Sequence, residues 1–149
     1  MKIIEVITHN LAYQVKHPYR NSCSEWVRFR PATLVEVRTD NGLVGWGEGD
    51  GAPSPGNIET HVIGKDPFDY EVIYDNLSHN GANAASACGV EIALWDLMGK
   101  ALDKPIYQLL GGKFRERIRV YNTCGPYGDF DFMKNADEYA RDLLGRGIE

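Results

Sequence analysis

The residues that could carry chemistry in this sequence are scattered acids and histidines, and none of them falls into a known catalytic spacing. Asp129 and Asp131 form a carboxylate pair, but the other positions of a calcium-binding loop are missing, so a solvated turn is favoured. Glu48 with Asp50 could bind a cation, although Gly-rich turns commonly carry acids for structural reasons. Four histidines without the spacing of zinc ligands complete the set: His9, His17, His61 and His79. The sequence also lacks the glycine motifs of nucleotide sites and the G-x-S-x-G turn of serine hydrolases, which argues against both chemistries.

The composition is that of an acidic globular protein. The chain has 149 residues, 43% of them hydrophobic and 25% charged, and its net charge of −5 argues against nucleic-acid binding. No apolar run approaches a membrane span of about 20 residues, and the charged segment Met1–Glu5 does not resemble a secretory signal. The three cysteines show no C-x-x-C spacing and are interpreted as reduced thiols. We therefore expect a cytoplasmic protein without nucleic-acid or membrane partners.

An antiparallel sheet is predicted for the N-terminal third. Apolar residues alternate with polar ones in four segments: 2–9, 11–17, 33–39 and 43–48. Asn41-Gly42 joins the last two, and this dipeptide is a strong hairpin signal because both turn residues adopt positive φ. Two loops are predicted, one over residues 18–30 with polar and aromatic side chains, and one over residues 49–56 with several Gly and Pro residues.

Helical spacing replaces strand alternation after Asp66. Asp66 is a predicted N-cap and Pro67 a predicted first helical residue. The elements predicted after this point are a helix from Asp66, a helix over 84–102 with apolar residues around nearly its whole circumference, a turn over 106–110, a strand over 118–124 and a helix over 134–146. Strands followed by helices indicate an α+β domain over residues 1–112. The strand and helix that follow indicate the start of an α/β domain over residues 113–149.

A long ordered pattern in the second of these helices and after it indicates a family. The pattern and two shorter signatures are Ala-Leu-Trp-Asp (93–96), Gly-Lys (99–100), Pro105 and Leu-Leu-Gly-Gly (109–112), with Val-Gly-Trp-Gly-Glu (44–48) and Ile-Gly-Lys-Asp-Pro (63–67). On these residues the chain resembles the mandelate racemase/muconate lactonizing enzyme group of the enolase superfamily over essentially its whole length.

The resemblance implies a two-domain architecture. An α+β capping domain, with an antiparallel three-stranded meander followed by helices, would precede a TIM-type (β/α) barrel. The loops over 18–30 and 49–56 would close over the substrate at the junction of cap and barrel. Residues 118–124 would be the first barrel strand, and the next helix the first barrel helix. Because a barrel needs about 250 residues, the chain would contain only the first βα unit of a truncated barrel.

The same resemblance implies proton abstraction next to a carboxylate, with Mg²⁺ stabilising the resulting enediolate. The metal-binding carboxylates would lie on the third, fourth and fifth barrel strands, and a Lys-x-Lys base on the second. These positions fall beyond Glu149, so the chain is expected to contain no catalytic residue and no metal ligand. By itself it is expected to be inactive, whereas the intact parent would be a Mg²⁺-dependent enzyme and a homo-oligomer.

Five residues are candidates for contact with a small-molecule carboxylate substrate: Tyr19, Arg20, Trp26, Asp50 and Thr123. Arg20 could pair with a carboxylate, Trp26 could cover a sugar face, and Asp50 could accept hydrogen bonds from hydroxyl groups. Thr123 is predicted near the carboxyl end of the first barrel strand, where functional residues of such barrels lie. Packing or a solvated loop would also explain each of these residues.

Dehydration of an acid sugar is the favoured activity of the intact parent. The polar and aromatic first loop and the general similarity support this substrate class. Racemisation, epimerisation or cycloisomerisation of a related carboxylate is the nearest alternative. A function of another class also stays open, in which a non-catalytic truncated product acts only as a binding or oligomerisation module.

Overall fold

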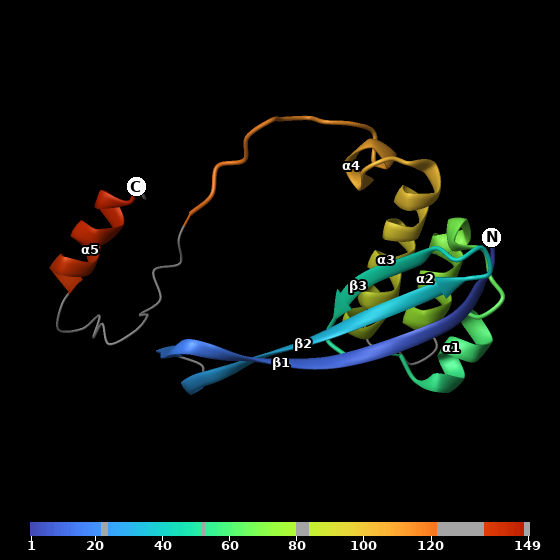
Figure 1. The fold of residues 1–149 in the computed structure, drawn as a ribbon, viewed down its shortest axis with the longest axis horizontal. Coiled ribbons are helices and arrows are strands. Elements are labelled where there is room, and N and C mark those ends of the chain that lie inside the picture. Colours follow the sequence, from blue (N-terminus) through green and yellow to red (C-terminus); the bar gives the residue numbers. More distant parts are fainter. Residues whose placement is uncertain (22–23, 52, 80–83, 122–135, 148–149) are drawn as a thin grey trace. The chain divides into compact units, whose positions relative to one another are not determined.

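Three strands form one sheet in the computed structural model, which describes residues 1–21, 24–51, 53–79, 84–121 and 136–147 (Figure 1). β1 spans Ile3–Asn21, β2 spans Ser24–Thr39 and β3 spans Val44–Gly49, and their order in the sheet is β1-β2-β3. β2 and β3 are antiparallel, with Val35 opposite Gly47. Gly42 has a φ of 84° in the turn that joins them. The predicted three-stranded meander and its hairpin at Asn41-Gly42 are therefore confirmed, but Gly42 and not Asn41 has the positive φ expected of both residues.

The loop predicted over residues 18–30 is wrong, because both strands continue into this segment. β1 joins the two predicted N-terminal strands and extends to Asn21, and β2 begins at Ser24. Residues 22–23 lie outside the described part of the chain. The aromatic and β-branched residues of this segment favour a strand. Pro18 is compatible with β1 because an edge strand can lack one backbone donor.

Five α-helices and one 3₁₀ helix follow the sheet along the described chain. Their bounds are α1 Pro55–His61, η1 Pro67–Asp69, α2 Tyr70–His79, α3 Ala84–Leu102, α4 Ile106–Leu109 and α5 Ala136–Gly145. The predicted N-cap is confirmed, since the Asp66 carboxylate accepts a hydrogen bond from Phe68 N at 3.1 Å. The second predicted loop, over 49–56, is too long, because β3 includes Gly49 and α1 begins at Pro55. In the part of the chain that is described, no helix combines the length and apolar character needed to cross a membrane.

The strand predicted over residues 118–124 is not formed in its described part. Residues 118–121 are exposed and have no strand pairing, and residues 122–124 lie outside the described part. A strand is stable only beside another strand, and the described sheet contains only β1, β2 and β3. The helix predicted over 134–146 corresponds to α5, on which Tyr139 and Leu143 are buried.

The chain divides into two compact units. The first, here named the cap unit, comprises Met1–Leu11 and Pro31–Phe114. The second, here named the arm unit, comprises Ala12–Arg30 and Arg115–Glu149, so it contains the distal part of the β1–β2 hairpin. The predicted domain boundary after residue 112 stays a prediction.

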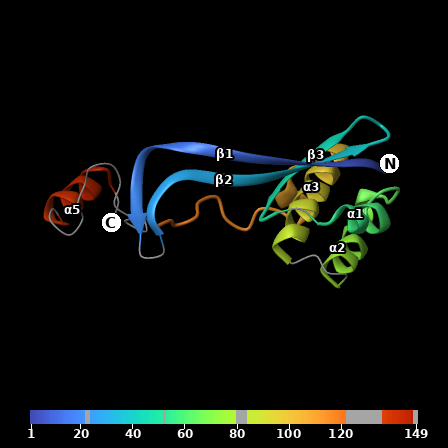
Figure 2. The same ribbon diagram turned by 90° about the horizontal axis from the view of Figure 1, so that it is seen from below.

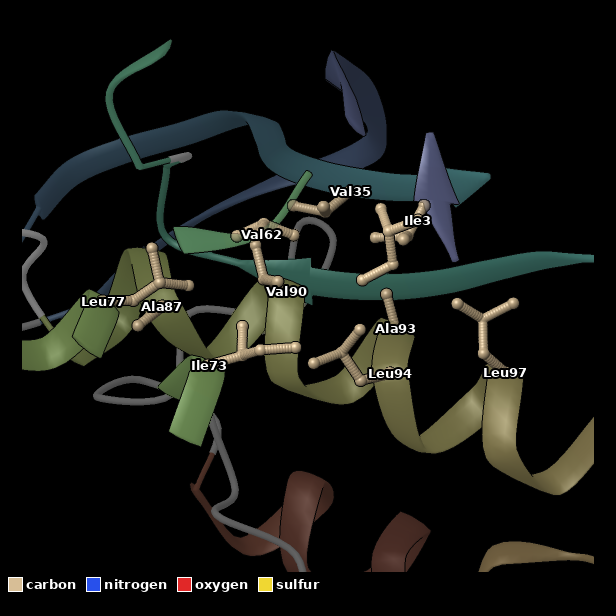
Figure 3. Packing of buried hydrophobic residues seen from close by; sticks show 11 residues of the cluster. Ile3, Val35, Val62, Ile73, Leu77, Ala87, Val90, Ala93, Leu94 and Leu97 are labelled. Carbon is tan, nitrogen blue, oxygen red and sulfur yellow. The ribbon is translucent and has the colours of Figure 1, made fainter. Parts of the chain in front are cut away.

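The core of the cap unit lies between the sheet and the helices α1, α2 and α3, which cover one side of it (Figure 2). The buried cluster consists of Ile3, Val35, Val37, Val62, Ile73, Leu77, Ala87, Val90, Ala93, Leu94 and Leu97 (Figure 3). α3 contributes five of these residues and packs against both β3 and α2. The prediction that this helix is buried on more than one side is therefore confirmed.

β3 has a glycine at every second position on the side that faces α3. A Cβ atom on Gly45 would lie 2.2 Å from Ala93 O, and one on Gly47 would lie 2.1 Å from Gly89 O. Gly49 is placed in the same way at the end of the strand. Since no side chain can come so close to a carbonyl oxygen, these glycines allow the backbone of β3 to lie directly on the backbone of α3.

Candidate functional site

Three of the five predicted substrate residues lie on the distal β1–β2 hairpin of the arm unit. Trp26 is near the start of β2 and is 53% exposed. Tyr19 and Arg20 lie near the end of β1, and their side chains are outside the described part of the chain. The backbones of all three residues therefore belong to one pair of strands.

Asp50 lies in the cap unit, directly after β3. Its side chain is exposed, and its N–H donates to Ala85 O in the first turn of α3 at 3.3 Å. This bond and the glycine contacts hold the segment that leaves β3 against α3. Thr123, the fifth candidate, lies outside the described residues. The structure therefore assigns the four described candidates to two different units.

The described residues do not offer a metal centre. No group of three or more His, Cys, Asp or Glu side chains in the described ranges could hold one ion. Glu48 and Asp50 are both exposed, and Asp129 and Asp131 lie outside these ranges. Because Mg²⁺ in proteins requires several converging oxygen ligands, the described residues do not fit a magnesium site, and we assign them no step of metal chemistry.

An ionic cluster that the sequence patterns did not predict lies on the face of the sheet opposite the core. His9 Nε2 lies 2.8 Å from Glu36 Oε2, and Arg38 Nε donates to Glu36 Oε1 at 2.7 Å. The ring centroids of His9 and Trp46 are 5.4 Å apart, and only 7% of the Glu36 side chain is exposed. The hydrogen bond from Arg38, followed by that with His9, lowers the pKa of Glu36 below its usual value of 4.5. The alternation of Glu36 with the buried Val35 was the available sequence signal for this outer face.

Folding stability should depend on the ionisation of Glu36 at acid pH. A carboxyl group whose pKa is lower in the folded than in the unfolded state stabilises the fold above the unfolded value, and this stabilisation is lost as the pH falls through the folded-state pKa. We therefore expect the free energy of unfolding to decrease below pH 4.5, less steeply in E36Q than in the unchanged chain. Urea unfolding at a series of acid pH values measures this slope. E59Q, at an exposed position on α1, is the control, and identical slopes for E36Q and the unchanged chain would contradict the prediction.

A hollow of about 370 Å³ lies where α3 ends and α4 begins. Its lining residues are Asp96, Gly99, Lys100, Asp103, Lys104, Pro105 and Ile106. Lys100 Nζ lies 2.6 Å from Asp96 Oδ2, so the two charges nearest the sheet are paired with each other. Neither Trp26 nor Asp50, the two predicted substrate residues whose side chains are described, is among its lining residues.

Comparison with known proteins relates the chain to one sequence family. Residues 3–111 match the family described as mandelate racemase/muconate lactonizing enzyme, N-terminal domain. The chain is 37% identical to D-galactarolactone cycloisomerase of Agrobacterium fabrum over a 163-residue alignment, which covers 100% of the chain and 42% of that protein. It is 38% identical to D-galactonate dehydratase of Variovorax paradoxus over 129 residues, which cover 78% of the chain and 33% of that protein. The chain thus spans less than half of the length of either relative.

The fold is also similar to that of a solved enzyme. A dipeptide epimerase from Enterococcus faecalis, determined in complex with Mg and the dipeptide L-Leu-L-Tyr, superposes with a TM-score of 0.62 at 32% identity. The superposition covers 75% of the chain and 35% of the epimerase. The relatives found by sequence and by structure therefore include a cycloisomerase, a dehydratase and an epimerase.

Proposed function

The chain belongs to the mandelate racemase/muconate lactonizing enzyme family through its N-terminal domain, and from this premise we propose that it caps the substrate site of an enolase-superfamily enzyme. In this proposal residues 1–112 form the capping domain and residues 113–149 begin the barrel domain. The whole protein is a homo-oligomer that abstracts a proton next to a substrate carboxylate. The favoured overall reaction is the dehydration of an acid sugar.

The observation that carries the proposal is the chemistry of the distal hairpin. Residues 12–30 contain four basic residues and one acidic residue in a chain of net charge −5: Lys16, Arg20, Arg28 and Arg30, with Glu25. Trp26 is more than half exposed on the same hairpin. A guanidinium group pairs with a carboxylate, and an indole ring covers the apolar face of a sugar. A basic and aromatic hairpin therefore complements a polyhydroxylated acid, the substrate class named for the dehydratase relative.

Magnesium is the proposed cofactor of the whole protein, and the Mg-bound epimerase of similar fold supports this choice. When bound, the ion would supply a positive charge that stabilises an enediolate. The residues of this chain have a different part in the reaction. Arg20 would orient the substrate carboxylate, Trp26 and Tyr19 would cover the carbon chain and exclude water, and Asp50 and Thr123 would accept hydrogen bonds from its hydroxyl groups.

A substrate screen with the full-length protein tests the proposal. Aldonates and aldarates are incubated with Mg²⁺, and a dehydratase should release a 2-keto-3-deoxy acid that semicarbazide detects. The activity should disappear when EDTA is added. The 149-residue chain assayed in parallel should give no product, because the proposed base and metal ligands lie in the rest of the protein.

Cycloisomerisation is the second candidate, supported by the 37% identity over the whole chain to D-galactarolactone cycloisomerase. Running the same screen in D₂O separates the candidates. An isomerase, epimerase or racemase should incorporate deuterium next to the carboxylate or open a lactone without loss of water. Neither turnover nor deuterium exchange with any acid would contradict an enzymatic parent and favour a binding or oligomerisation module.

Replacing Trp26 by alanine in the full-length protein should raise KM for the acid sugar about tenfold and change kcat less, because the ring contacts the substrate in both ground and transition states. Steady-state kinetics measures the effect. F29A is a matched control, since Phe29 is 57% exposed on the same strand but lies on the opposite face of β2. F29A should change KM by less than about twofold. Equal effects of the two substitutions would contradict a substrate contact by Trp26.

A further inference from the structure

β3 lies at the edge of the described sheet, so every second residue of this strand has backbone groups that no described strand pairs. The register places Trp46 opposite Glu36 and Val44 opposite Arg38. Antiparallel pairs alternate between hydrogen-bonded and non-hydrogen-bonded ones. Because Trp46 N donates to α3 rather than to β2, Trp46 and Val44 occupy the positions whose N–H and C=O groups point away from β2.

Two charged side chains of α3 form hydrogen bonds with backbone groups at this edge. Asp96 Oδ2 accepts from Trp46 N at 2.9 Å, and Lys100 Nζ donates to Val44 O at 2.7 Å. The same Asp96 oxygen lies 2.6 Å from Lys100 Nζ, so one ion pair bridges two backbone groups of the strand. At the end of the strand, Asp50 N donates to Ala85 O of the same helix. α3 therefore supplies side-chain partners for Trp46 N and Val44 O at the β3 edge and a backbone partner directly after the strand.

The glycines of β3 explain how these side chains reach the edge. Asp96 and Lys100 are one turn apart on α3, and the helix lies against β3 because Gly45 and Gly47 have no side chain. A larger residue on this face would move the helix away and lengthen both capping bonds. The Val-Gly-Trp-Gly segment of β3 (44–47) and the Trp-Asp-x-x-x-Lys segment of α3 (95–100) therefore pack against each other.

The opposite edge of the sheet, at the start of β1, is covered by backbone hydrogen bonds. Ile3 N donates to Lys65 O at 2.9 Å, and Gly64 N donates to Ile3 O at 2.8 Å. The turn before η1 therefore pairs with the first residue of β1 by backbone alone. Among these contacts at the two edges of the described sheet, those on β3 are made by ionisable side chains.

We propose that Asp96 and Lys100 seal the β3 edge, and that without them this strand pairs with a strand of a second copy of the chain. An unpaired N–H and C=O two residues apart are the groups through which an edge strand recruits another strand. Side chains that hydrogen-bond to these two groups leave neither of them free for another strand, and so prevent such pairing. The Asp96–Lys100 pair accordingly protects the cap unit from sheet-to-sheet association.

Substitutions of Asp96 in the full 149-residue chain distinguish the effect of its hydrogen bond to Trp46 N from the effect of its charge. D96A removes the acceptor of Trp46 N, whereas D96N keeps an oxygen acceptor but loses the charge. D96A should self-associate with rising concentration beyond the state of the unchanged chain, and D96N should not. D142A is the matched control, because Asp142 also pairs with a residue four positions later, Arg146 at 2.9 Å, but on α5. Sedimentation velocity measures the association.

Amide hydrogen exchange by NMR identifies the edge itself. In dilute D96A the Trp46 amide should exchange at least about tenfold faster than in the unchanged chain, whereas the Gly45 and Gly47 amides, which face β2, should not change. At high concentration the Trp46 amide should become protected again as a second copy pairs with it. K100M removes the partner of Val44 O and the ion pair with Asp96, but it leaves the acceptor of Trp46 N in place. It should associate less than D96A and provides the test if D96A does not fold.

Three results would overturn the proposal. The first is an unchanged assembly state of D96A and K100M at every concentration. The second is association without renewed protection of the Trp46 amide, which would indicate aggregation through another surface. The third is association of D96N to the same extent as D96A, which would show that the charge of Asp96, and not its hydrogen bond to the strand, is responsible.

Discussion

Replacing Gly47 by alanine should lower the free energy of unfolding by about 3 kcal/mol or more, the upper end of the cost of overpacking a core. The new Cβ would lie 2.1 Å from Gly89 O and 2.8 Å from Ala93 N, and both of these atoms belong to helix backbone. A flexible side chain could rotate away, but backbone atoms move only if α3 shifts along the sheet. Urea unfolding followed by circular dichroism measures the loss.

Two other glycines provide the comparison for this prediction. G49A should cost less than G47A, because its Cβ would meet its nearest neighbour, Ala85 O, at 2.9 Å rather than 2.1 Å. G56A, at the exposed start of α1 with no atom within 4 Å, should be neutral or stabilise by up to about 1 kcal/mol, since alanine is the better helix former. An equal cost for G47A and G56A would contradict the close packing of β3 on α3.

Replacing Leu94 by alanine should lower the free energy of unfolding by about 3 kcal/mol, within the range of about 2–5 kcal/mol for such truncations. Leu94 is a fully buried residue of α3, and its side chain belongs to the core cluster of the cap unit (Figure 3). The truncation removes apolar contacts and leaves a cavity that the surrounding helices fill only in part. Urea unfolding again gives the value.

Leu102 is the matched control for Leu94 because it lies on the same helix. It is 50% exposed in the last turn of α3, so L102A should cost less than about 1 kcal/mol. L94M, which conserves most of the volume, should cost less than about 1.5 kcal/mol. If L102A destabilised the chain as much as L94A, the core would have to be centred elsewhere on α3.

Elements with strong local signals are those that sequence patterns predict well here. Asp66 followed by Pro67 predicts the start of η1 and α2, because capping depends only on residues within one helical turn. Asn41-Gly42 predicts the β2–β3 hairpin, because a tight turn also depends only on neighbouring residues. α3 has the predicted bounds of residues 84–102, since its length and apolar content leave no competing interpretation.

Segments whose structure depends on distant partners are those that local patterns miss. Residues 18–30 contain proline and other turn-forming residues, yet β1 extends to Asn21 and β2 begins at Ser24. Residues 118–121 alternate like a strand but remain unpaired, because no described strand lies beside them. In both cases the outcome depends on strand pairing, which is a property of two segments and not of one.

In the candidate site, too, local residue types could be read from the sequence, whereas contacts between distant segments could not. Residue type alone identified Trp26 and Asp50 as candidates for contact with a sugar acid; both side chains are exposed, and the contact itself stays a prediction. The cluster of Glu36 with His9 and Arg38 could not be predicted, because its members come from two strands and one of them is 27 residues away.

By itself the sequence determined the family, the α+β class of the cap, the N-cap at Asp66 and the bounds of α3, because these depend on motifs and on periodicity along the chain. Only the tertiary structure decided that the Val-Gly-Trp-Gly segment (44–47) and the Trp-Asp-x-x-x-Lys segment (95–100) contact each other. Gly45 and Gly47 let α3 lie on β3, and Asp96 and Lys100 of that helix then reach the backbone of the strand 50 and 56 residues away. Contacts over such separations depend on how elements pack, which no local pattern records.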